Sequence, residues 1–447
     1  MEKFIIKGGK KLVGKTVVSG AKNVALKALV AACLTDEEVV IENIPLISDF
    51  FVMAEIIKEL GGKIEINGHR AVIRLKEIKK NKISLEKAAE IRTSSMFMAP
   101  LLARAGHAVI PNPGGCRIGA RPIDRTIEGL KRMGVIALYN SNDGYFHLKI
   151  GEKGVKKLKG TTYKFGKNTH TGTETLLLCA VLAKGKTILE NAAAEPEIDE
   201  LINFLNKMGA DVKRTSERLI MINGVEKMHG VKFAIGPDRN EVVTLAIAAI
   251  ITNGDIFVEG VEKKDVLEFL EKLEEAGGGF KEEKNGLRFY SKNTLLPTNV
   301  ATACYPGFMT DWQGPWAVLM TTAQGVSTIH ETVYENRFSY VEQLRKMGAK
   351  IEFYDPKVKN PEEFYNFNLE DDKEDFHHGA RIFGPKVLHN GIVLISDLRA
   401  GATLVLAALA AKGQSAVFGI EHLDRGYENF EKKLKSLGAD IKRVVSE

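Results

Sequence analysis

Apolar positions along this chain follow two periods that alternate regularly. Ala- and Leu-rich stretches without a polar face lead through short polar turns into β-branched segments of alternating pattern, as after residues 24–33, 175–183 and 402–411. A more charged stretch of helical period follows, as at residues 49–60 and 199–208, and ends at a glycine. The helical period is about 3.6 residues and the strand period 2. The pattern therefore predicts units of one buried helix, one surface helix and three or four short strands.

This unit occurs six times. The surface helices end at a Leu-Gly, Met-Gly or Ala-Gly step, with glycines at positions 61, 134, 209, 277, 348 and 438. The unit is therefore about 70 residues long, and the last copy carries an insertion. The predicted β-branched strands are EVVIEN, HAVIPN, KTILEN, DIFVEG, STIHET and SAVFGI. Because one unit cannot cover both faces of its own sheet, units must pack together. We predict two domains of three units each, with a ligand cleft between the domains.

The insertion in the last unit lies between Phe353 and Leu394 and is both charged and aromatic. Its most polar part reads DPKVKNPEEFYNFNLEDDKEDFHH. We interpret this segment, including its adjacent histidines His377 and His378, as a solvated loop, although it could also shape the mouth of the cleft.

Composition narrows the class of protein. The 447 residues are 44% hydrophobic and 27% charged, and 63 Lys and Arg against 57 Asp and Glu give a net charge of +6 without a basic arm. This balance suits small anionic ligands better than nucleic acid. No apolar run approaches the roughly 18 residues of a membrane span. We therefore expect a cytoplasmic protein with reduced thiols, no membrane insertion and no nucleic-acid partner.

Polar and charged residues mark the starts of the buried helices. These starts are residues 19–23, 92–95, 169–172, 238–241, 310–313 and 397–401. Their Ser, Thr and Asp residues are ordinary N-caps. A cation at a helix N-terminus opposes the helix dipole, so Lys22, Arg92, Arg239 and Arg399 indicate either a bound anion or a salt bridge to a nearby carboxylate.

Cys116 is the candidate reactive thiol. It lies in the Gly- and Pro-rich stretch PNPGGCRIGARP at residues 111–122, which we interpret as a mobile loop, and the neighbouring Arg117 favours its thiolate. The other cysteines, Cys33, Cys179 and Cys304, lack this setting and are predicted to be core residues. No cysteine or histidine spacing matches a metal site. Asp311, at a helix start after the break YPGF, is the candidate carboxylate base.

Several motifs together resemble the enolpyruvyl transferase family over essentially the whole chain. They are SGAKN at 19–23, PGGCRIGARP at 113–122, AEPEID at 194–199, PDRNE at 237–241, FMTD at 308–311, ENRF at 335–338, DLRAG at 397–401 and HLDRGYE at 422–428. The resemblance implies an α/β fold of two inverse α/β barrel domains, also called α/β prisms, each built from three βαβαββ-type units. Residues 20–236 would form the first domain, and residues 1–19 with 237–447 the second.

The resemblance also implies a reaction. The enolpyruvyl group of phosphoenolpyruvate would move to the 3′-hydroxyl of UDP-N-acetylglucosamine with release of phosphate, in the first committed step of peptidoglycan synthesis and without a cofactor. Cys116 would act as general acid, with a covalent phospholactoyl adduct on its thiol as a further possibility, and Asp311 would accept the hydroxyl proton. Lys22, Arg121, Arg399 and Arg425 would hold phosphate and carboxylate.

By the same resemblance, a larger set of residues would contact the nucleotide sugar or phosphoenolpyruvate. The set is Lys22, Asn23, Arg92, Arg121, Pro122, Ile123, Asp124, Arg125, His170, Thr171, Gly172, Asp311, Val333, Arg399 and Arg425. The chain departs from the family at His170-Thr171-Gly172, where Ser-Val-Gly is usual. Two alternatives remain: an enolpyruvyl transferase for another acceptor, and a catalytically silent sugar-nucleotide binding protein. We expect a monomer.

Overall fold

The computed structural model describes residues 2–114, 120, 122–151, 157–292 and 294–445. The chain divides into two units. Unit 1 contains Met1–Ser19 and Pro237–Glu447, and unit 2 contains Gly20–Cys116 and Pro122–Gly236. Residues 117–121, of which only Ala120 is described, are grouped with unit 1.

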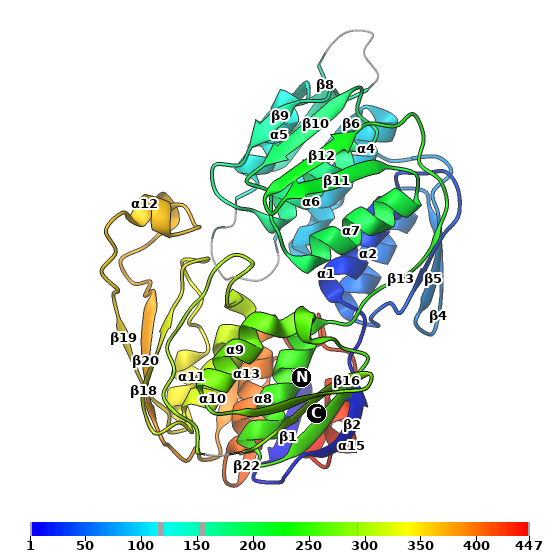
Figure 1. Ribbon diagram of the computed structural model, residues 1–447. Helices are drawn as coiled ribbons and strands as arrows, with labels where there is room; N and C mark the ends of the chain where they lie inside the picture. The colour runs from blue at the N-terminus through cyan, green and yellow to red at the C-terminus, as the bar shows by residue number, and fades with distance from the viewer. Residues whose placement is uncertain (1, 115–119, 121, 152–156, 293, 446–447) are drawn as a thin grey trace. The chain divides into compact units, whose positions relative to one another are not determined.

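Unit 2 contains three sheets (Figure 1). The first has the order β13-β3-β5-β4, with β3 Val39–Glu42, β4 Lys63–Asn67, β5 Arg70–Arg74 and β13 Lys232–Ala234. The second has the order β11-β12-β10-β9, with β9 Thr162–Lys164, β10 Lys186–Glu190, β11 Asp211–Ser216 and β12 Leu219–Asn223. The third has the order β6-β8-β7, with β6 His107–Pro111, β7 Val135–Asn140 and β8 Tyr145–Ile150.

Each sheet of unit 2 is accompanied by one buried helix and at least one more polar helix. The buried helices are α1 (Lys22–Ala32), the 3-10 helix η1 (Arg92–Phe97) continued by α4 (Met98–Ala105), and α6 (His170–Ala180). The amphipathic helices are α2 (Ser48–Glu59), α3 (Leu85–Glu90), α5 (Asp124–Arg132) and α7 (Pro196–Lys207). Helix α1 packs against α7, and α6 packs against α4 and α5. The buried helices thus share one hydrophobic core.

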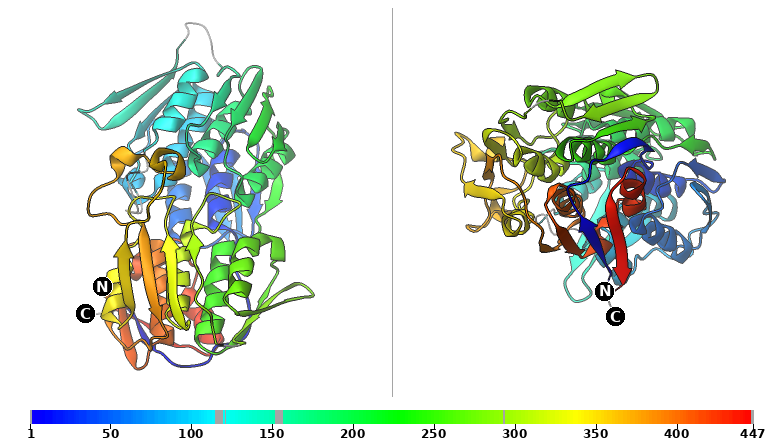
Figure 2. Two further views of the ribbon diagram at one scale, coloured as in Figure 1. Left: turned by 60° about the vertical axis from the view of Figure 1, so that its left-hand side comes forward. Right: turned by 90° about the horizontal axis from the view of Figure 1, so that it is seen from below.

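Unit 1 repeats this plan with three four-stranded sheets. The first has the order β21-β22-β1-β23, with β1 Glu2–Lys7, β21 Ile392–Leu394, β22 Gln414–Phe418 and β23 Asp440–Val445. The second has the order β15-β16-β14-β2, with β2 Val13–Val17, β14 Asp255–Glu259, β15 Gly279–Glu283 and β16 Gly286–Tyr290. The third, yellow to orange in Figure 2, has the order β17-β18-β20-β19, with β17 Val300–Ala301, β18 Gly325–His330, β19 Lys350–Tyr354 and β20 Gly379–Gly384.

Three helices form the centre of unit 1. They are α8 (Arg239–Ile251), α10 (Gln313–Met320), which continues the 3-10 helix η3 (Thr310–Trp312), and α13 (Leu398–Ala410). All residues of α8 are buried, as its lack of a polar face predicts. Gly314 allows α10 to approach α13 closely, because a Cβ at this position would lie 2.3 Å from Thr403 Oγ1. The outer helices are η2 (Lys263–Val266), α9 (Leu267–Glu275), α11 (Val341–Lys346), α14 (Ile420–Leu423) and α15 (Phe430–Ser436).

A common strand pattern confirms the sixfold repeat predicted from the sequence. In five sheets a short edge strand runs parallel to the β-branched strand that follows the buried helix, in the pairs β13 with β3, β9 with β10, β2 with β14, β17 with β18 and β21 with β22. In the sixth sheet an isolated parallel bridge from Lys82 to Val109 of β6 takes this place.

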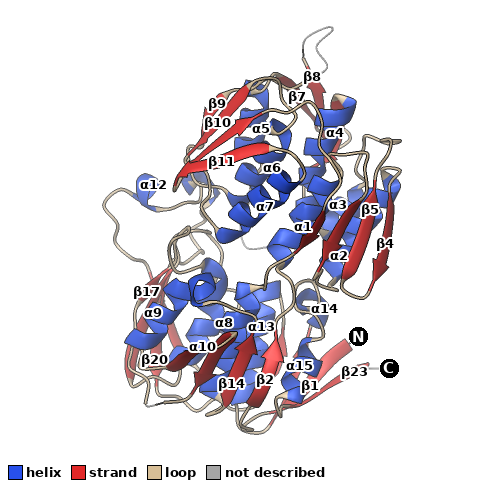
Figure 3. Cartoon of the chain, turned by 45° about the vertical axis from the view of Figure 1, so that its right-hand side comes forward, coloured by secondary structure: helices blue, strands red, loops and turns tan. Residues whose placement is uncertain are grey.

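The N-terminal strand β1 lies in the interior of its sheet. It is antiparallel to both neighbours, with Ile5 opposite Ala416 of β22 and Lys442 of β23. Figure 3 shows β1 and β23 near the two ends of the chain. Arg443 of β23 stabilises this sheet further. It forms ion pairs with Glu2 of β1 at 2.8 Å and with Asp424, the residue after α14, at 2.7 Å.

The insertion in the last unit is more ordered than a solvated loop. It joins β19 to β20 and contains α12 (Pro361–Phe364) and the 3-10 helix η4 (Leu369–Asp371). Tyr365 and Phe367 are buried and stack on each other, and His378 is buried and bonds to Asp372 at 2.9 Å. The interpretation as a solvated loop was therefore wrong for this part, because aromatic side chains spaced within a polar segment can gather into a small core of their own.

Cys33 and Cys179 are buried, as predicted. Cys304 is only partly buried, because it lies in the turn between β17 and η3 and not in a helix. Cys116 and the mobile loop predicted around it lie largely outside the described residues, as does Arg121. Within the described part of the chain, no helix has both the length and the apolar character needed to cross a membrane.

Candidate active site

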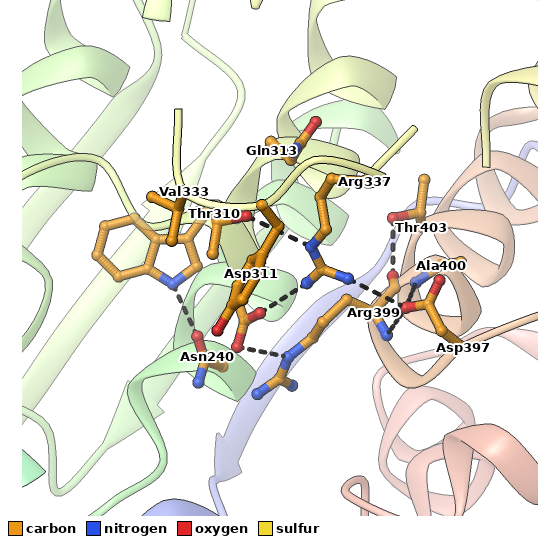
Figure 4. A network of polar contacts seen from close by, with 12 residues as sticks. Asn240, Thr310, Asp311, Gln313, Val333, Arg337, Asp397, Arg399, Ala400 and Thr403 are labelled. Carbon is orange, nitrogen blue, oxygen red and sulfur yellow. Dashed lines mark hydrogen bonds and ion pairs between the residues drawn. The ribbon is translucent and has the colours of Figure 1, made fainter. Parts of the chain in front are cut away.

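Asp311 lies in η3, immediately before the buried helix α10, and two arginines hold it. Arg337 Nη2 donates to Asp311 Oδ1 at 2.7 Å, and Arg399 Nε donates to Asp311 Oδ2 at 3.1 Å (Figure 4). The Asp311 side chain keeps 22% of its surface exposed, whereas the arginines keep 5% and 9%. The buried arginines thus fix the orientation of the carboxylate and favour its charged form, while part of the side chain remains open to a ligand.

Asp397 supports the same pair of arginines. It is the N-cap of α13, where its Oδ1 accepts from the backbone N–H groups of Arg399 at 3.0 Å and Ala400 at 3.1 Å. It also lies 3.4 Å from Arg337 Nη1. One carboxylate therefore caps the helix that carries Arg399 and neutralises Arg337.

The electrostatics of this cluster favour charged arginines. Burial lowers the pKa of Arg399 and is the largest single effect, but Asp311, Tyr427 and Asp238 together outweigh it, and the pKa is raised overall. The same balance raises the pKa of Arg337, where Asp397 and Asp311 oppose burial. Both guanidinium groups therefore stay cationic.

Glu331, at the end of β18, orders the segment that follows. Its Oε1 accepts from the backbone N–H groups of Val333 at 2.7 Å and Tyr334 at 2.9 Å, and its Oε2 accepts from Thr310 Oγ1 at 2.8 Å and from Gln313 Nε2. Burial raises the pKa of Glu331, and these hydrogen bonds partly offset the effect. Val333, a predicted ligand contact, is thus tied to the helix start that carries Asp311.

These groups surround a small pocket within unit 1. It is lined by Thr310, Asp311, Gln313, Gly314, Arg337, Tyr340, Asp397, Arg399, Ala400 and Thr403. Of the predicted site residues, Asp311 and Arg399 meet here and Val333 is connected to them. Arg425 lies in the turn after α14 and is partly buried.

The predicted site residues of unit 2 lie at the starts of its helices. Lys22 is the first residue of α1 and Asn23 the second, Arg92 begins η1, and His170, Thr171 and Gly172 begin α6. Pro122 and Ile123 precede α5, and Asp124 and Arg125 are its first two residues. Helix η1 packs against α1 and α6, and α5 packs against α6, so these starts belong to neighbouring helices.

Lys22 is held by a local turn and a carboxylate. The turn needs Gly20, because a Cβ there would lie 1.8 Å from the carbonyl oxygen of Asn43. Lys22 Nζ is 2.6 Å from Asp49 of α2, and both side chains are almost fully buried. The salt-bridge alternative considered for Lys22 is therefore present, as it is for Arg399 with Asp311.

Sequence reasoning missed three members of the unit 1 cluster: Glu331, Arg337 and Asp397. Arg337 lies within the ENRF motif, so its position was available, but nothing in the local pattern shows that a charged residue there is buried. Asp397 was identified only as part of a helix start. Its contact with Arg337 joins residues 60 positions apart.

Comparison with solved structures identifies the fold class of this protein. The structure resembles the enolpyruvyl transferase NikO from Streptomyces tendae, with a TM-score of 0.84, 24% identity and coverage of 100% of this chain and 99% of the other. It also resembles EPSP synthase from Acinetobacter baumannii, with a TM-score of 0.74, 18% identity and full coverage of both chains. The fold is therefore the two-domain inverse α/β barrel of the enolpyruvyl transferases, as predicted.

Sequence comparison establishes the family to which the chain belongs. The sequence model of the family EPSP synthase (3-phosphoshikimate 1-carboxyvinyltransferase) matches residues 6–434 of this chain. The chain is 41% identical to UDP-N-acetylglucosamine 1-carboxyvinyltransferase 1 of Carboxydothermus hydrogenoformans, covering 100% of this chain and 99% of that protein. It is 40% identical to UDP-N-acetylglucosamine 1-carboxyvinyltransferase of Koribacter versatilis, covering 99% and 97%. This chain belongs to the EPSP synthase family of enolpyruvyl transferases.

Proposed function

We propose that this protein transfers the enolpyruvyl group of phosphoenolpyruvate to the 3′-hydroxyl of UDP-N-acetylglucosamine and releases phosphate. The main support is the identity of about 40% with carboxyvinyltransferases of that name over nearly the whole of both chains. The product would enter peptidoglycan synthesis. We further propose a monomer in the cytoplasm, where the thiol of Cys116 stays reduced.

The proposed chemistry is an addition followed by an elimination. Cys116 gives its thiol proton to the methylene carbon of phosphoenolpyruvate while the sugar hydroxyl oxygen bonds to the neighbouring carbon and Asp311 takes the hydroxyl proton. In the second step a methyl proton returns to the Cys116 thiolate, the carbon–oxygen bond to phosphate breaks, and phosphate leaves with the proton that Asp311 held. All atoms and charges balance without a cofactor.

The geometry around Asp311 supports its part in this scheme. The two arginines fix both carboxylate oxygens, and the exposed fifth of the side chain is available to a hydroxyl. Arg399, with Lys22, Arg121 and Arg425, would stabilise the phosphate and carboxylate charges of phosphoenolpyruvate. Arg337 has a positioning role, because it contacts Asp311, Asp397 and Thr310.

The experiment is a phosphate-release assay with each substrate alone and with both. We expect release only when phosphoenolpyruvate and UDP-N-acetylglucosamine are both present. Replacement Cys116→Ser should remove most of the turnover without unfolding the protein, whereas the control Cys304→Ser, at a partly buried thiol, should keep it. A Cys116→Ser variant with the wild-type rate would contradict the assignment of the acid.

Another acceptor is the second candidate, because α6 begins with His170-Thr171 where the family usually has Ser-Val. The same assay with shikimate 3-phosphate and with other sugar nucleotides separates the two. Faster release with one of those acceptors would favour the alternative. No release with any acceptor, despite binding of the nucleotide sugar, would favour a silent binding protein.

A further inference from the structure

Glu174 is a buried carboxyl group that the proposed chemistry does not use. It lies in the second turn of α6, and its side chain has no exposed surface. Within the described residues, neither of its oxygens has a hydrogen-bond partner of good geometry. The nearest cationic groups are Lys27 Nζ of α1, at 3.4 Å from Oε2, and His170 Nδ1, at 3.7 Å from the same oxygen. Helices α1 and α6 are labelled in Figure 1.

Burial decides the protonation state of this group. Removal from water raises the pKa of Glu174 to about 8, although Lys27 opposes the shift. At neutral pH the carboxyl group therefore carries a proton. A protonated side chain also explains how an acid can lie in the core at 3.4 Å from Lys27 without forming a close ion pair.

The surroundings of Glu174 contribute charges of both signs. From α1 comes Lys27, and from the start of α7 come Glu195 and Glu197, which both raise the pKa of Glu174. Lys22, also on α1, is paired with Asp49. Helices η1 and α5, which pack on α6 as well, bring the charged residues Arg92, Asp124, Arg125 and Glu128.

His170 links this buried group to the surface. It is the first residue of α6, one turn before Glu174, and a quarter of its side chain is exposed. The N-terminus of a buried helix attracts anions and disfavours a cation. An imidazolium at this place is therefore costly in the free protein and becomes favourable when an anion lies against the helix start.

His170 Nδ1 lies 3.7 Å from Glu174 Oε2, so the ring and the carboxyl group are close enough to share a proton after a small side-chain movement. When the carboxyl group is protonated and the ring is neutral, the pair holds one proton. Moving that proton from the carboxyl group to the ring leaves a carboxylate next to two cations, Lys27 and His170. The pair can therefore change its charge distribution without exchanging a proton with solvent.

We propose that Glu174 stores the proton that His170 takes up when the diphosphate of a nucleotide sugar binds at the start of α6. The O–H bond of the Glu174 carboxyl group breaks, an N–H bond forms on the His170 ring, and the new carboxylate is balanced by Lys27 and the imidazolium. Glu174 is thus a positioning residue, which acts through His170. This inference rests on the proposed function, because it takes UDP-N-acetylglucosamine as the ligand.

The test is calorimetric binding of UDP-N-acetylglucosamine at pH 7.5 in buffers of different ionisation enthalpy. Wild type should take up almost no proton, because the proton is supplied internally. Glu174→Gln, which has the shape of the protonated acid, should draw up to one proton from the buffer for each ligand bound. Its dissociation constant should rise by up to about tenfold per pH unit between pH 7 and 8, while that of wild type stays nearly constant. Equal proton uptake by both proteins would overturn the proposal.

Three further variants and a spectroscopic readout complete the test. Carbon-13 histidine NMR, with His170→Asn to assign the signal, should show that His170 becomes charged on ligand binding in wild type at pH 7.5. The matched control Glu241→Gln removes another buried glutamate, paired with Lys433 in unit 1, and should leave the His170 signal unchanged. Should Glu174→Gln fail to fold, Lys27→Met takes its place and should weaken binding by removing the cation that balances the new carboxylate. A His170 signal that stays neutral on binding would overturn the proposal.

Failure of the proposed function can be distinguished from failure of proton storage by Glu174. If wild type binds no UDP-N-acetylglucosamine, the proposed function fails, and inorganic pyrophosphate serves as the anion in the same NMR experiment. Charging of His170 by pyrophosphate in wild type, without proton uptake from the buffer, would still support proton storage by Glu174. No change in the His170 signal would overturn it.

Discussion

At the scale of single residues, the cluster around Asp311 consists of charges that define one another's positions. Arg337 and Arg399 each bind one oxygen of Asp311, and Asp397 binds Arg337 and caps the helix of Arg399. Removing one member leaves a buried charge without compensation, which is costlier than the loss of a surface ion pair. Effects on turnover and on stability must therefore be measured side by side in every variant of this cluster.

Asp311→Asn tests the proposed base. The amide cannot accept the hydroxyl proton, so we expect turnover to fall by about 10²- to 10⁴-fold. Phosphate release under saturating substrates measures the effect, and thermal unfolding shows whether the fold is retained. Asp255→Asn is the matched control, because Asp255 binds Arg288 at 2.6 Å on the surface of unit 1, and it should leave turnover within about twofold. A comparable loss in both variants would contradict the assignment of Asp311.

Residue types at helix starts could be predicted from the sequence, but their partners could not. Lys22 and Arg399 stood out because a cation opposes the helix dipole. Asp49 and Arg337, which hold Lys22 and Asp311, lie in segments whose local pattern gives no sign of that contact. The buried pair of Lys27 with Glu174 was missed for the same reason: the two residues lie in separate helices, and nothing in the local pattern of either helix indicates the contact.

At the scale of elements, periodicity predicted most of the structure. The buried stretch expected at residues 402–411 lies in α13, Leu398–Ala410, and the strand KTILEN is β10, Lys186–Glu190. The insertion was the main error, because a charged composition hid the aromatic residues that order it. Its backbone supports the segment that carries Val333: Asn366 N donates to Thr332 O at 2.8 Å, and Glu331 N donates to His378 O at 2.8 Å.

Tyr365 tests whether the insertion positions that segment. The ring of Tyr365 is buried against Phe367, and its hydroxyl lies 3.1 Å from His330 Nε2. Tyr365→Ala should loosen residues 331–337 and raise the KM for the nucleotide sugar by about tenfold, the equivalent of about 1.4 kcal/mol. Tyr365→Phe keeps the ring packing and should stay within about twofold. Initial rates at varied nucleotide sugar measure both, and equal KM values for Ala and wild type would show that the insertion has no such role.

At the scale of the whole molecule, the two units differ in how the chain builds them. Residues 20–236 form unit 2 apart from residues 117–121, whereas unit 1 needs both ends of the chain. Strand β1 pairs with β22 on one side and β23 on the other. Without β1 the sheet loses one of its two interior strands, and β22 and β23 are each left with an unpaired edge.

Truncation gives a direct test at this scale. A chain without residues 1–19 should keep unit 2 folded while unit 1 unfolds. Both tryptophans of the chain, Trp312 and Trp316, are buried in unit 1, so their fluorescence should shift to that of exposed indole. Circular dichroism of residues 20–236 expressed alone should show one cooperative thermal transition. Native tryptophan fluorescence in the truncated chain would contradict the expectation.

The interior place of β1 has a consequence for synthesis on the ribosome. This strand is translated long before its partners at residues 414–418 and 440–445. At about 5–20 residues per second, the wait lasts on the order of tens of seconds. During that time the nascent N-terminus must avoid mispairing, and chaperones that shield exposed strands would act there. The sheet containing β1 can be completed only after translation has reached the final strand, so a prematurely terminated chain would lack it.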